Sequence, residues 1–217
     1  MSARRLEWCF LGSVPYAEGV RLQEGVRAAL RRGDGPERLL LLEHPPVYTL
    51  GRNAGEAEIT ADAGWLAARG IAVHESNRGG QATYHGPGQL VGYPILDLSP
   101  DRRDVRRYVA DLCAVLVRTL AELGVEAAAR PSPHVGVWVG EEKIASLGVH
   151  LSRWITTHGF ALNVTTDVGA FAGIVPCGLP GIALTSIARR TGVAWPLPEV
   201  ARRLVPHFAT VFAREAV

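Results

Sequence analysis

Three apolar runs in the middle of the sequence, joined by short polar turns, constrain the fold more than any other feature. The runs cover residues 135–139, 144–151 and 155–164, with turns at 140–142 and 152–154. They are rich in the β-branched and aromatic residues that favour strands. Strands joined by such short turns pair antiparallel, because a parallel pair needs a long crossover. The sequence therefore predicts an antiparallel meander.

Helices and further strands are expected on both sides of this meander. Apolar residues repeat at helical spacing over residues 16–32, where Gly33 closes the helix, and over 104–123. Thr60 can cap a helix that ends near Gly70. Other expected elements are strands at 6–11, 38–43, 47–50, 71–75 and 90–98, and helices at 185–190 and 198–214. This irregular order, without a repeated strand-helix-strand unit, favours an α+β fold with a largely antiparallel sheet.

Length and composition limit the class of protein. A chain of 217 residues is most simply one domain, residues 1–217, with room for a sizeable core. Its net charge of +2 gives no general reason to expect nucleic-acid binding. The sequence starts without the apolar stretch of a signal peptide, and no segment is long enough to cross a bilayer. We therefore expect a cytoplasmic protein, with a monomer as the default assembly.

Positive charge is clustered where the helix over residues 104–123 is expected to begin. Arg102, Arg103, Arg106 and Arg107 fall close together there. Such a run is usually a solvated helix face, and the alternative is a docking surface for an acidic partner.

Residues 78–89, with the sequence RGGQATYHGPGQ, form the densest motif of the chain. Glycine allows a backbone to approach a ligand closely, and its amide can then bind an oxygen or a phosphate. The motif matches neither GxGxxG nor GxxxxGK[ST], so it does not support a Rossmann cofactor or a P-loop nucleotide. We interpret it as a loop that holds a ligand, marked by Arg78 and His85. A pair of tight hairpin turns that flank residues 82–85 is the alternative.

The three cysteines differ in their sequence surroundings. Their odd number and wide spacing suggest neither a disulfide framework nor a zinc site. Cys9 and Cys113 lie in apolar sequence, which is typical of cysteines in a core. Cys177 instead lies between Pro176 and Gly178, which fix the backbone and leave the sulfur uncrowded. We predict that Cys177 is a nucleophile, with a structural thiol as the alternative.

The chain contains one lysine, Lys143, against twenty-two arginines. Arginine stays protonated in proteins, whereas lysine can lose its proton. A single lysine in such a chain suggests that an amine is needed there, and the alternative is turn chemistry at residues 140–143. A protonated amine near the Cys177 sulfur would lower the thiol pKa from about 8.5 and could exchange protons with the entering or leaving group.

A histidine could take this role instead of the lysine. The candidates are His85, His150 and His158, but no catalytic Cys-His signature surrounds Cys177, and a lone strand histidine is more often structural. The spacing of these histidines also fits no paired metal pattern, so we expect no metal site.

Three sequence blocks together resemble the lipoyl(octanoyl) transferase family. They are RGGQATYHGPGQLVGYPILDL, then KIASLGVHL followed by THGFALNV, and finally GIVPCGL followed by ALTSI. The resemblance runs in order from about Leu40 to Ile187, without a departure at a motif position. It implies the catalytic-domain fold of lipoate and biotin protein ligases, with a larger mixed, mainly antiparallel sheet and a smaller sheet, flanked by helices.

The resemblance also implies an activity and the residues that carry it. Members of the family are acyltransferases that move an octanoyl group from acyl carrier protein to a lysine of lipoyl domains, as in 2-oxoacid dehydrogenases and glycine cleavage H protein. Cys177 matches the nucleophile that forms the acyl thioester, and Lys143 the residue that lowers its pKa. Neither ATP nor a metal is expected, because the acyl group arrives as a thioester on phosphopantetheine. The substrate-binding residues implied by the match are Arg78, Gly79, Gly80, Gln81, Ala82, Thr83, Tyr84, His85, Ser146, Leu147, Gly148, Gly159, Phe160 and Ala161.

Three alternative functions stay open at this point. An ATP-dependent lipoate or biotin protein ligase needs no nucleophilic thiol, so Cys177 argues against it. An amidotransferase that moves octanoyl groups between lipoyl domains would also use a cysteine and would differ only in its acyl donor. The presence of both Lys143 and Cys177 argues against a non-catalytic module that holds an acylated carrier or lipoyl domain.

Overall fold

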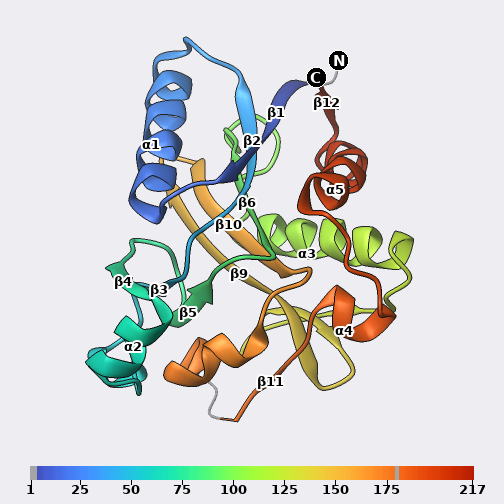
Figure 1. Ribbon diagram of the computed structural model, residues 1–217. Coiled ribbons are helices and arrows are strands. Elements are labelled where there is room, and N and C mark those ends of the chain that lie inside the picture. Colours follow the sequence, from blue (N-terminus) through green and yellow to red (C-terminus); the bar gives the residue numbers. More distant parts are fainter. Residues whose placement is uncertain (1–3, 179–180) are drawn as a thin grey trace.

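A large mixed sheet and a small sheet form the framework of the protein (Figure 1). The computed structural model describes residues 4–178 and 181–217, without the side chains of Glu56 and Cys177. The strands of the large sheet are β1 (Arg4–Ser13), β2 (Glu37–Glu43), β6 (Gln89–Ile95), β7 (Ala128–Arg130), β8 (Gly136–Val139), β9 (Glu142–Ser152), β10 (Ile155–Asn163), β11 (Ala183–Leu184) and β12 (Arg214–Ala216). The strands of the small sheet are β3 (Val47–Leu50), β4 (Ala72–Glu75) and β5 (Ala82–His85).

Strand pairing confirms the predicted antiparallel meander. Within the described residues, the order of the large sheet is β12-β1-β2-β6-β10-β9-β8-β7, and β11 joins it beside β9. β8, β9 and β10 pair antiparallel in succession, and β6 pairs antiparallel with both β10 and β2. Parallel pairing occurs where β1 joins β2 and β12, and where β11 joins β9. The predicted α+β class, with a larger mixed sheet and a smaller one, is confirmed.

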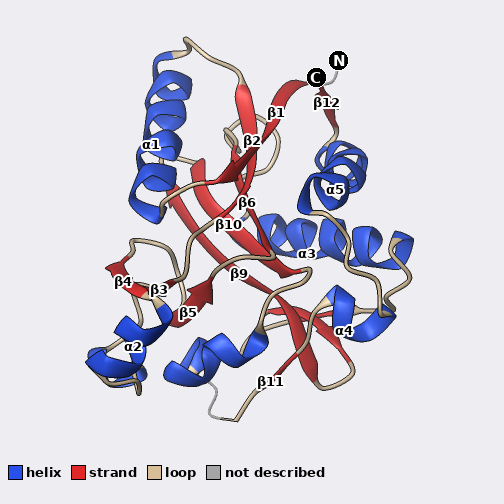
Figure 2. Cartoon of the chain, viewed as in Figure 1, coloured by secondary structure: helices blue, strands red, loops and turns tan. Residues whose placement is uncertain are grey.

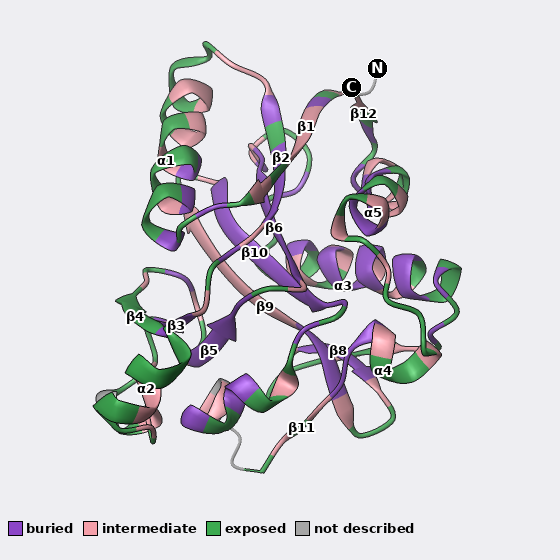
Figure 3. Cartoon of the chain, in the orientation of Figure 1, coloured by how far each residue is buried: buried purple, intermediate pink, exposed green. Residues whose placement is uncertain are grey.

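Helices cover both faces of the large sheet, with α1 on one face and α3 and α5 on the other (Figure 2). The helices are α1 (Tyr16–Arg32), α2 (Ala63–Arg69), α3 (Val105–Glu122), α4 (Ile187–Thr191) and α5 (Leu197–Phe212), and the 3₁₀ turns are η1 (Glu56–Glu58), η2 (Val168–Gly173) and η3 (Pro176–Gly178). Alternate side chains of β2 point to opposite faces. Leu40 and Leu42 pack in the core cluster that contacts Val26 of α1. Leu39 and Leu41 pack with α3 and α5. The central strands β6 and β10 are buried along their whole length for this reason (Figure 3).

Helix ends follow local sequence signals, with one exception. α1 covers the predicted residues, and Gly33 ends it in the left-handed conformation at φ 78°. The side chain of Asp104 accepts a hydrogen bond from the backbone N–H of Arg107 and so caps α3. The prediction that Thr60 caps α2 is wrong: the helix begins at Ala63, so Asp62 holds the cap position, and its side chain accepts from the Trp65 N–H. None of the helices in the described ranges is both long and apolar enough to span a membrane.

Two features differ from expectation. Residues 82–85 form the buried strand β5 rather than a loop, and β5 pairs with β3 in the small sheet. Arg102 is only 7% exposed: it forms an ion pair with Asp111, and its guanidinium lies 4.8 Å from the ring centre of Phe212. Arg102 therefore ties the start of α3 to α5 and does not belong to an exposed basic flank.

The close packing of β6 against β10 yields a test of stability. A Cβ at Gly92 would lie 2.1 Å from the ring of Phe160, its partner across the two strands. We expect Gly92→Ala to lower the free energy of unfolding by about 1–3 kcal/mol, since the ring must move within a packed core. Gly25→Ala on the exposed side of α1, where a Cβ meets nothing within 4 Å, should instead raise it by about 0.5–1 kcal/mol. Urea unfolding of both variants checks this, and equal midpoints would contradict it.

Candidate functional site

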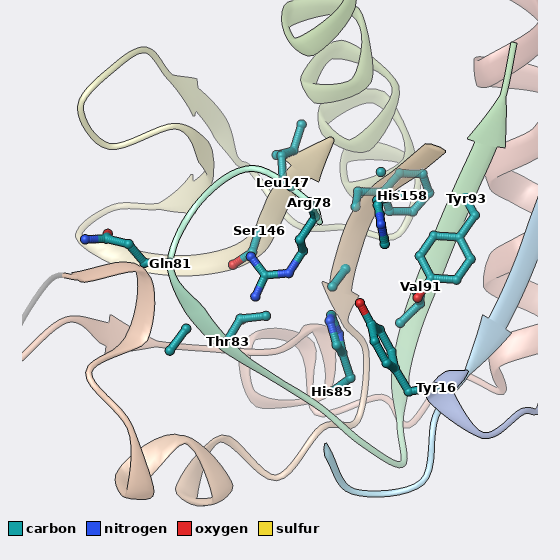
Figure 4. A pocket seen from close by; sticks show the side chains of 15 residues that line it. Tyr16, Arg78, Gln81, Thr83, His85, Val91, Tyr93, Ser146, Leu147 and His158 are labelled. Carbon is teal, nitrogen blue, oxygen red and sulfur yellow. The ribbon is translucent and has the colours of Figure 1, made fainter. Parts of the chain in front are cut away.

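A narrow cavity of about 40 Å³ opens between α1, β5 and the strands β6, β9 and β10 (Figure 4). Its wall contains most of the residues that sequence reasoning proposed for substrate binding: Arg78, Gln81, Ala82, Thr83, His85, Ser146, Leu147, Gly148, Gly159, Phe160 and Ala161. Residues 60 or more positions apart in the chain thus meet at one place. Gly79, Gly80 and Tyr84 are outside this lining.

The Arg78-Gly79-Gly80 segment lies directly against β9. The Gly79 N–H donates to the carbonyl of Val149 at 2.9 Å, and a Cβ at Gly148 would lie 3.0 Å from both the Arg78 Cδ and the Gly79 carbonyl oxygen. The Arg78 guanidinium is buried and donates to the backbone carbonyl of Thr49 at 2.6 Å. The glycines therefore allow the backbone of this motif to lie close against β9, and this contact places the Arg78 side chain in the cavity wall.

Tyr84 points away from the cavity. Its ring packs edge-on against Phe171 at 5.3 Å and against Tyr48 at 5.9 Å, in the core of the small sheet. Burial raises the pKa of Tyr84 to about 12. Alternation along β5 explains this, because Thr83 and His85 face the side of the strand that Tyr84 does not.

Four residues of the cavity wall were not predicted as substrate-binding residues: Tyr16, Val91, Tyr93 and His158. Of these, His158 was proposed only as a candidate partner of the cysteine. His158 adopts a positive φ of 55° within β10, so its N–H leaves the regular ladder and donates to the Gln23 side chain at 2.6 Å. Its ring reaches the Asn77 side chain, with Nε2 2.6 Å from Oδ1. Burial, with the nearby charge of Arg78, lowers the pKa of His158 to about 3, so it is neutral at pH 7. No sequence pattern signals this kink.

Two of the three candidate histidines meet in the cavity. His85 and His158 line it, whereas His150 lies on β9 outside the lining. Burial, together with His44 and Arg78, holds the pKa of His85 well below 6.5. A neutral, buried histidine is suited to hydrogen bonding rather than to charge stabilisation.

Lys143 is buried in the large sheet, with 3% of its surface exposed. It lies across from Trp138 of β8 and beside Leu184 of β11, and its Nζ is 5.6 Å from the Trp138 ring centre. A Cβ at Gly136 would lie 2.5 Å from the Lys143 Cε, so the glycine provides the space that the lysine side chain fills. This environment is that of a positioned amine rather than of a mobile turn residue.

The other cysteines occupy different environments. Cys113 is buried in the core, as expected, and burial raises its pKa to about 11 although Lys143 acts in the opposite direction. Cys9 is half-buried on β1 against the α1 side of the core. Neither thiol has the lowered pKa of a reactive cysteine.

The segment that carries Cys177 is fixed on both sides. Before it, the Val175 N–H donates to the carbonyl of Glu58 at 2.8 Å; after it, the Thr185 N–H donates to the carbonyl of Lys143 at 3.0 Å. Gly178, at φ 64°, lies against Gln81: a Cβ there would be 2.1 Å from the Gln81 Oε1. The turn η3 therefore lies at the Gln81 end of the cavity. The side chain of Cys177 is outside the described residues, so its pairing with Lys143 stays a prediction.

Sequence comparisons relate the chain to proteins of one family. The family model described as the lipoyl protein ligase A/B catalytic domain matches residues 15–209. An octanoyltransferase of Myxococcus xanthus is 50% identical over 213 residues, which cover 95% of this chain and 59% of that protein. An octanoyltransferase of Solibacter usitatus is 52% identical over 202 residues, covering 93% of this chain and 90% of that protein. The chain thus spans less than two thirds of the first relative and most of the second.

Solved structures share the fold at low sequence identity. A lipoate-protein ligase A bound with ATP has a TM-score of 0.76 and 18% identity, covering 100% of this chain and 90% of that one. The biotin protein ligase of Aquifex aeolicus has a TM-score of 0.53 and 12% identity, covering 97% of this chain and 69% of that one. These likenesses show the fold alone. From the family model and the sequence relatives together, the chain belongs to the lipoyl protein ligase A/B catalytic domain family.

Proposed function

We propose that the protein is an octanoyltransferase that moves an octanoyl group from acyl carrier protein to a lysine of lipoyl domains. The observation that carries this proposal is that η3, the turn of Cys177, lies at one end of a cavity whose wall includes apolar side chains. Sequence relatives at 50% and 52% identity, named octanoyltransferases, support it. Ligases that use ATP share the fold, but their identity of 20% or less carries no activity to this chain.

The proposed reaction has two acyl transfers. The Cys177 thiolate attacks the thioester carbonyl of the donor, the carbon–sulfur bond to phosphopantetheine breaks, and an S-octanoyl enzyme forms. The amine of the target lysine then attacks this new thioester, loses a proton, and releases the Cys177 thiolate as the amide forms. Thioester exchange is nearly balanced and amide formation from a thioester is downhill. The proposed reaction therefore needs neither ATP nor a metal.

Lys143 would assist both steps, by its positive charge in the first and by accepting a proton in the second. A protonated amine beside the sulfur favours the thiolate and so favours the first attack. In the second step the same group, once neutral, can take the proton that the attacking amine must lose. The buried setting of Lys143 between Gly136 and Trp138 supports this role, since it restricts where the amine can lie.

The cavity supports an acyl substrate of medium length. Val91, Leu147, Phe160 and Ala161 supply apolar lining along its sides. Burying a methylene group is worth about 0.8 kcal/mol, so half a dozen would contribute roughly 5 kcal/mol at most. This is enough to make affinity depend on chain length.

The proposed partners are an acidic carrier protein as donor and a lipoyl domain as acceptor. Arg103, Arg106 and Arg107 remain exposed near the start of α3 and could steer an acidic partner, whereas Arg102 cannot because it is buried. We further propose that the protein works as a monomer in the cytoplasm. An acyl donor on a second lipoyl domain is the closest alternative, and substrate tests separate the two.

The nucleophile is tested by the mass of the intact protein. After incubation with octanoyl-carrier protein and no ATP, we expect one octanoyl adduct on Cys177 that hydroxylamine removes. Cys177→Ser should form no thioester and should lose transfer by several orders of magnitude, whereas Cys113→Ala should retain the adduct. An adduct on Cys9 or Cys113, or wild-type transfer by Cys177→Ser, would show that the nucleophile is wrongly assigned. Equal labelling by an octanoyl-lipoyl domain would favour the amidotransferase alternative.

Two substitutions at Lys143 separate charge from proton transfer. Lys143→Arg keeps the positive charge, but the guanidinium gives up no proton and its planar head is larger than an ammonium group. Lys143→Met removes the charge. We expect both variants to lose amide formation by at least about 100-fold, and only Lys143→Met to lose the fast acylation of Cys177 as well. Rapid-quench measurement of the two steps checks this, and wild-type turnover by Lys143→Arg would contradict it.

A further inference from the structure

The end of the cavity farthest from η3 is lined by polar rings. Gln81, which contacts Gly178, lies at one end of the lining, and Tyr16, Tyr93 and His158 gather at the other (Figure 4). His85 stacks on Tyr16 with 6.2 Å between ring centres. A cavity lined for a hydrocarbon chain alone would end in aliphatic side chains, whereas this end carries polar atoms whose remaining hydrogen-bonding capacity a ligand can use.

The hydrogen-bond network fixes the role of the Tyr93 hydroxyl. The Nδ1 of His44 is 2.5 Å from the carbonyl of Val14, and because a carbonyl only accepts, Nδ1 carries the proton. Burial lowers the pKa of His44 to about 4, so its Nε2 is an unprotonated acceptor at pH 7. Tyr93 donates its hydroxyl proton to this Nε2 at 2.7 Å. The Tyr93 oxygen is thereby left with acceptor capacity only.

The same reasoning applies to His85. The Gln89 amide nitrogen donates to the Tyr84 carbonyl and to the Asn163 Oδ1, which identifies its Oε1 as the atom 2.7 Å from the His85 Nδ1. His85 therefore donates from Nδ1, and its Nε2 is an acceptor because the ring is neutral.

The Tyr16 hydroxyl completes the set of acceptors. It lies 2.7 Å from the Ser76 Oγ, and its oxygen keeps a lone pair that can accept from a ligand. The hydroxyls of Tyr16 and Tyr93 point toward one another across this end of the cavity (Figure 4). Three acceptor atoms, from Tyr16, His85 and Tyr93, thus belong to one wall. The positive charge of Arg78, which acts on all three of these groups, disfavours a cation there.

We propose that this end of the cavity is a subsite for a neutral hydrogen-bond donor, so that the protein takes medium-chain acyl groups with a terminal hydroxyl as well as unsubstituted octanoyl groups. This inference rests on the proposed function, since it names a further substrate class for the same site. A terminal hydroxyl would donate to an acceptor of this wall, whereas a methyl group in the same place would leave acceptors unpaired. With an octanoyl chain, a water can fill the subsite.

The test compares two acids of equal size, 8-hydroxyoctanoate and nonanoate, which differ only in a terminal hydroxyl or methyl group. Calorimetric titration measures the affinity of each free acid for the wild-type protein. We expect 8-hydroxyoctanoate to bind at least as tightly as nonanoate. An apolar subsite would instead favour nonanoate by about tenfold or more, since the hydroxyl would be buried without a partner. That result, or no binding of 8-hydroxyoctanoate to the folded protein, would overturn the proposal.

Variants that lack one hydroxyl oxygen test whether this wall determines the affinity ratio of the two acids. Tyr16→Phe and Tyr93→Phe each remove one acceptor oxygen, and each should shift the affinity ratio toward nonanoate by about tenfold. Tyr108→Phe removes a buried hydroxyl of an α3 residue, outside the cavity, and should leave the ratio unchanged. A ratio that neither cavity variant changes would overturn the proposal. Binding of the free acids needs no acylation of Cys177, so a protein that binds both but transfers neither would refute the proposed function alone.

Discussion

The cavity depends on the absence of side chains where β9 and β10 face each other. Gly148 and Gly159 are direct partners across these strands, and both belong to the cavity wall. A Cβ at Gly159 would lie 2.3 Å from the carbonyl oxygen of Gly92, and one at Gly148 would meet Arg78. A side chain at either position would fill the space or displace the Arg78 segment. The antiparallel register that aligns these two glycines is therefore a condition for the site as well as for the sheet.

Two different electrostatic environments lie on the two sides of the cavity. On one side, burial keeps His85 and His158 neutral beside the buried guanidinium of Arg78. On the other side, Lys143 is held by the strands β8, β9 and β11. The hydrogen bond from Thr185 to the Lys143 carbonyl connects this strand to the chain that follows Cys177. The strand β9 thus carries the Lys143 amine and, through Thr185, also holds the chain that follows Cys177.

Sequence reasoning succeeded where local signals decide the structure. The meander, the limits of α1 with Gly33, and the extent of α3 all follow from short-range patterns. Sequence reasoning failed where contacts between residues far apart in the chain decide the structure. Tyr16 reaches the cavity only because α1 packs beside β10 and β6, and the N–H freed by the kink at His158 is bound by Gln23, far away in the chain. The burial of individual residues after the glycine-rich motif could likewise not be derived without knowing that they form a strand.

Trp138 gives the site a built-in optical reporter. Its indole ring lies near two cations, with the Arg130 guanidinium 4.5 Å and the Lys143 Nζ 5.6 Å from the ring centre. Indole emission responds to nearby charge, because a cation shifts the energy of the excited state. Loss of the lysine proton would change the field at this ring while the exposed Arg130 pair with Glu141 stays in place. The chain has five tryptophans, so a variant that keeps Trp138 alone would report on the charge beside this ring without a label.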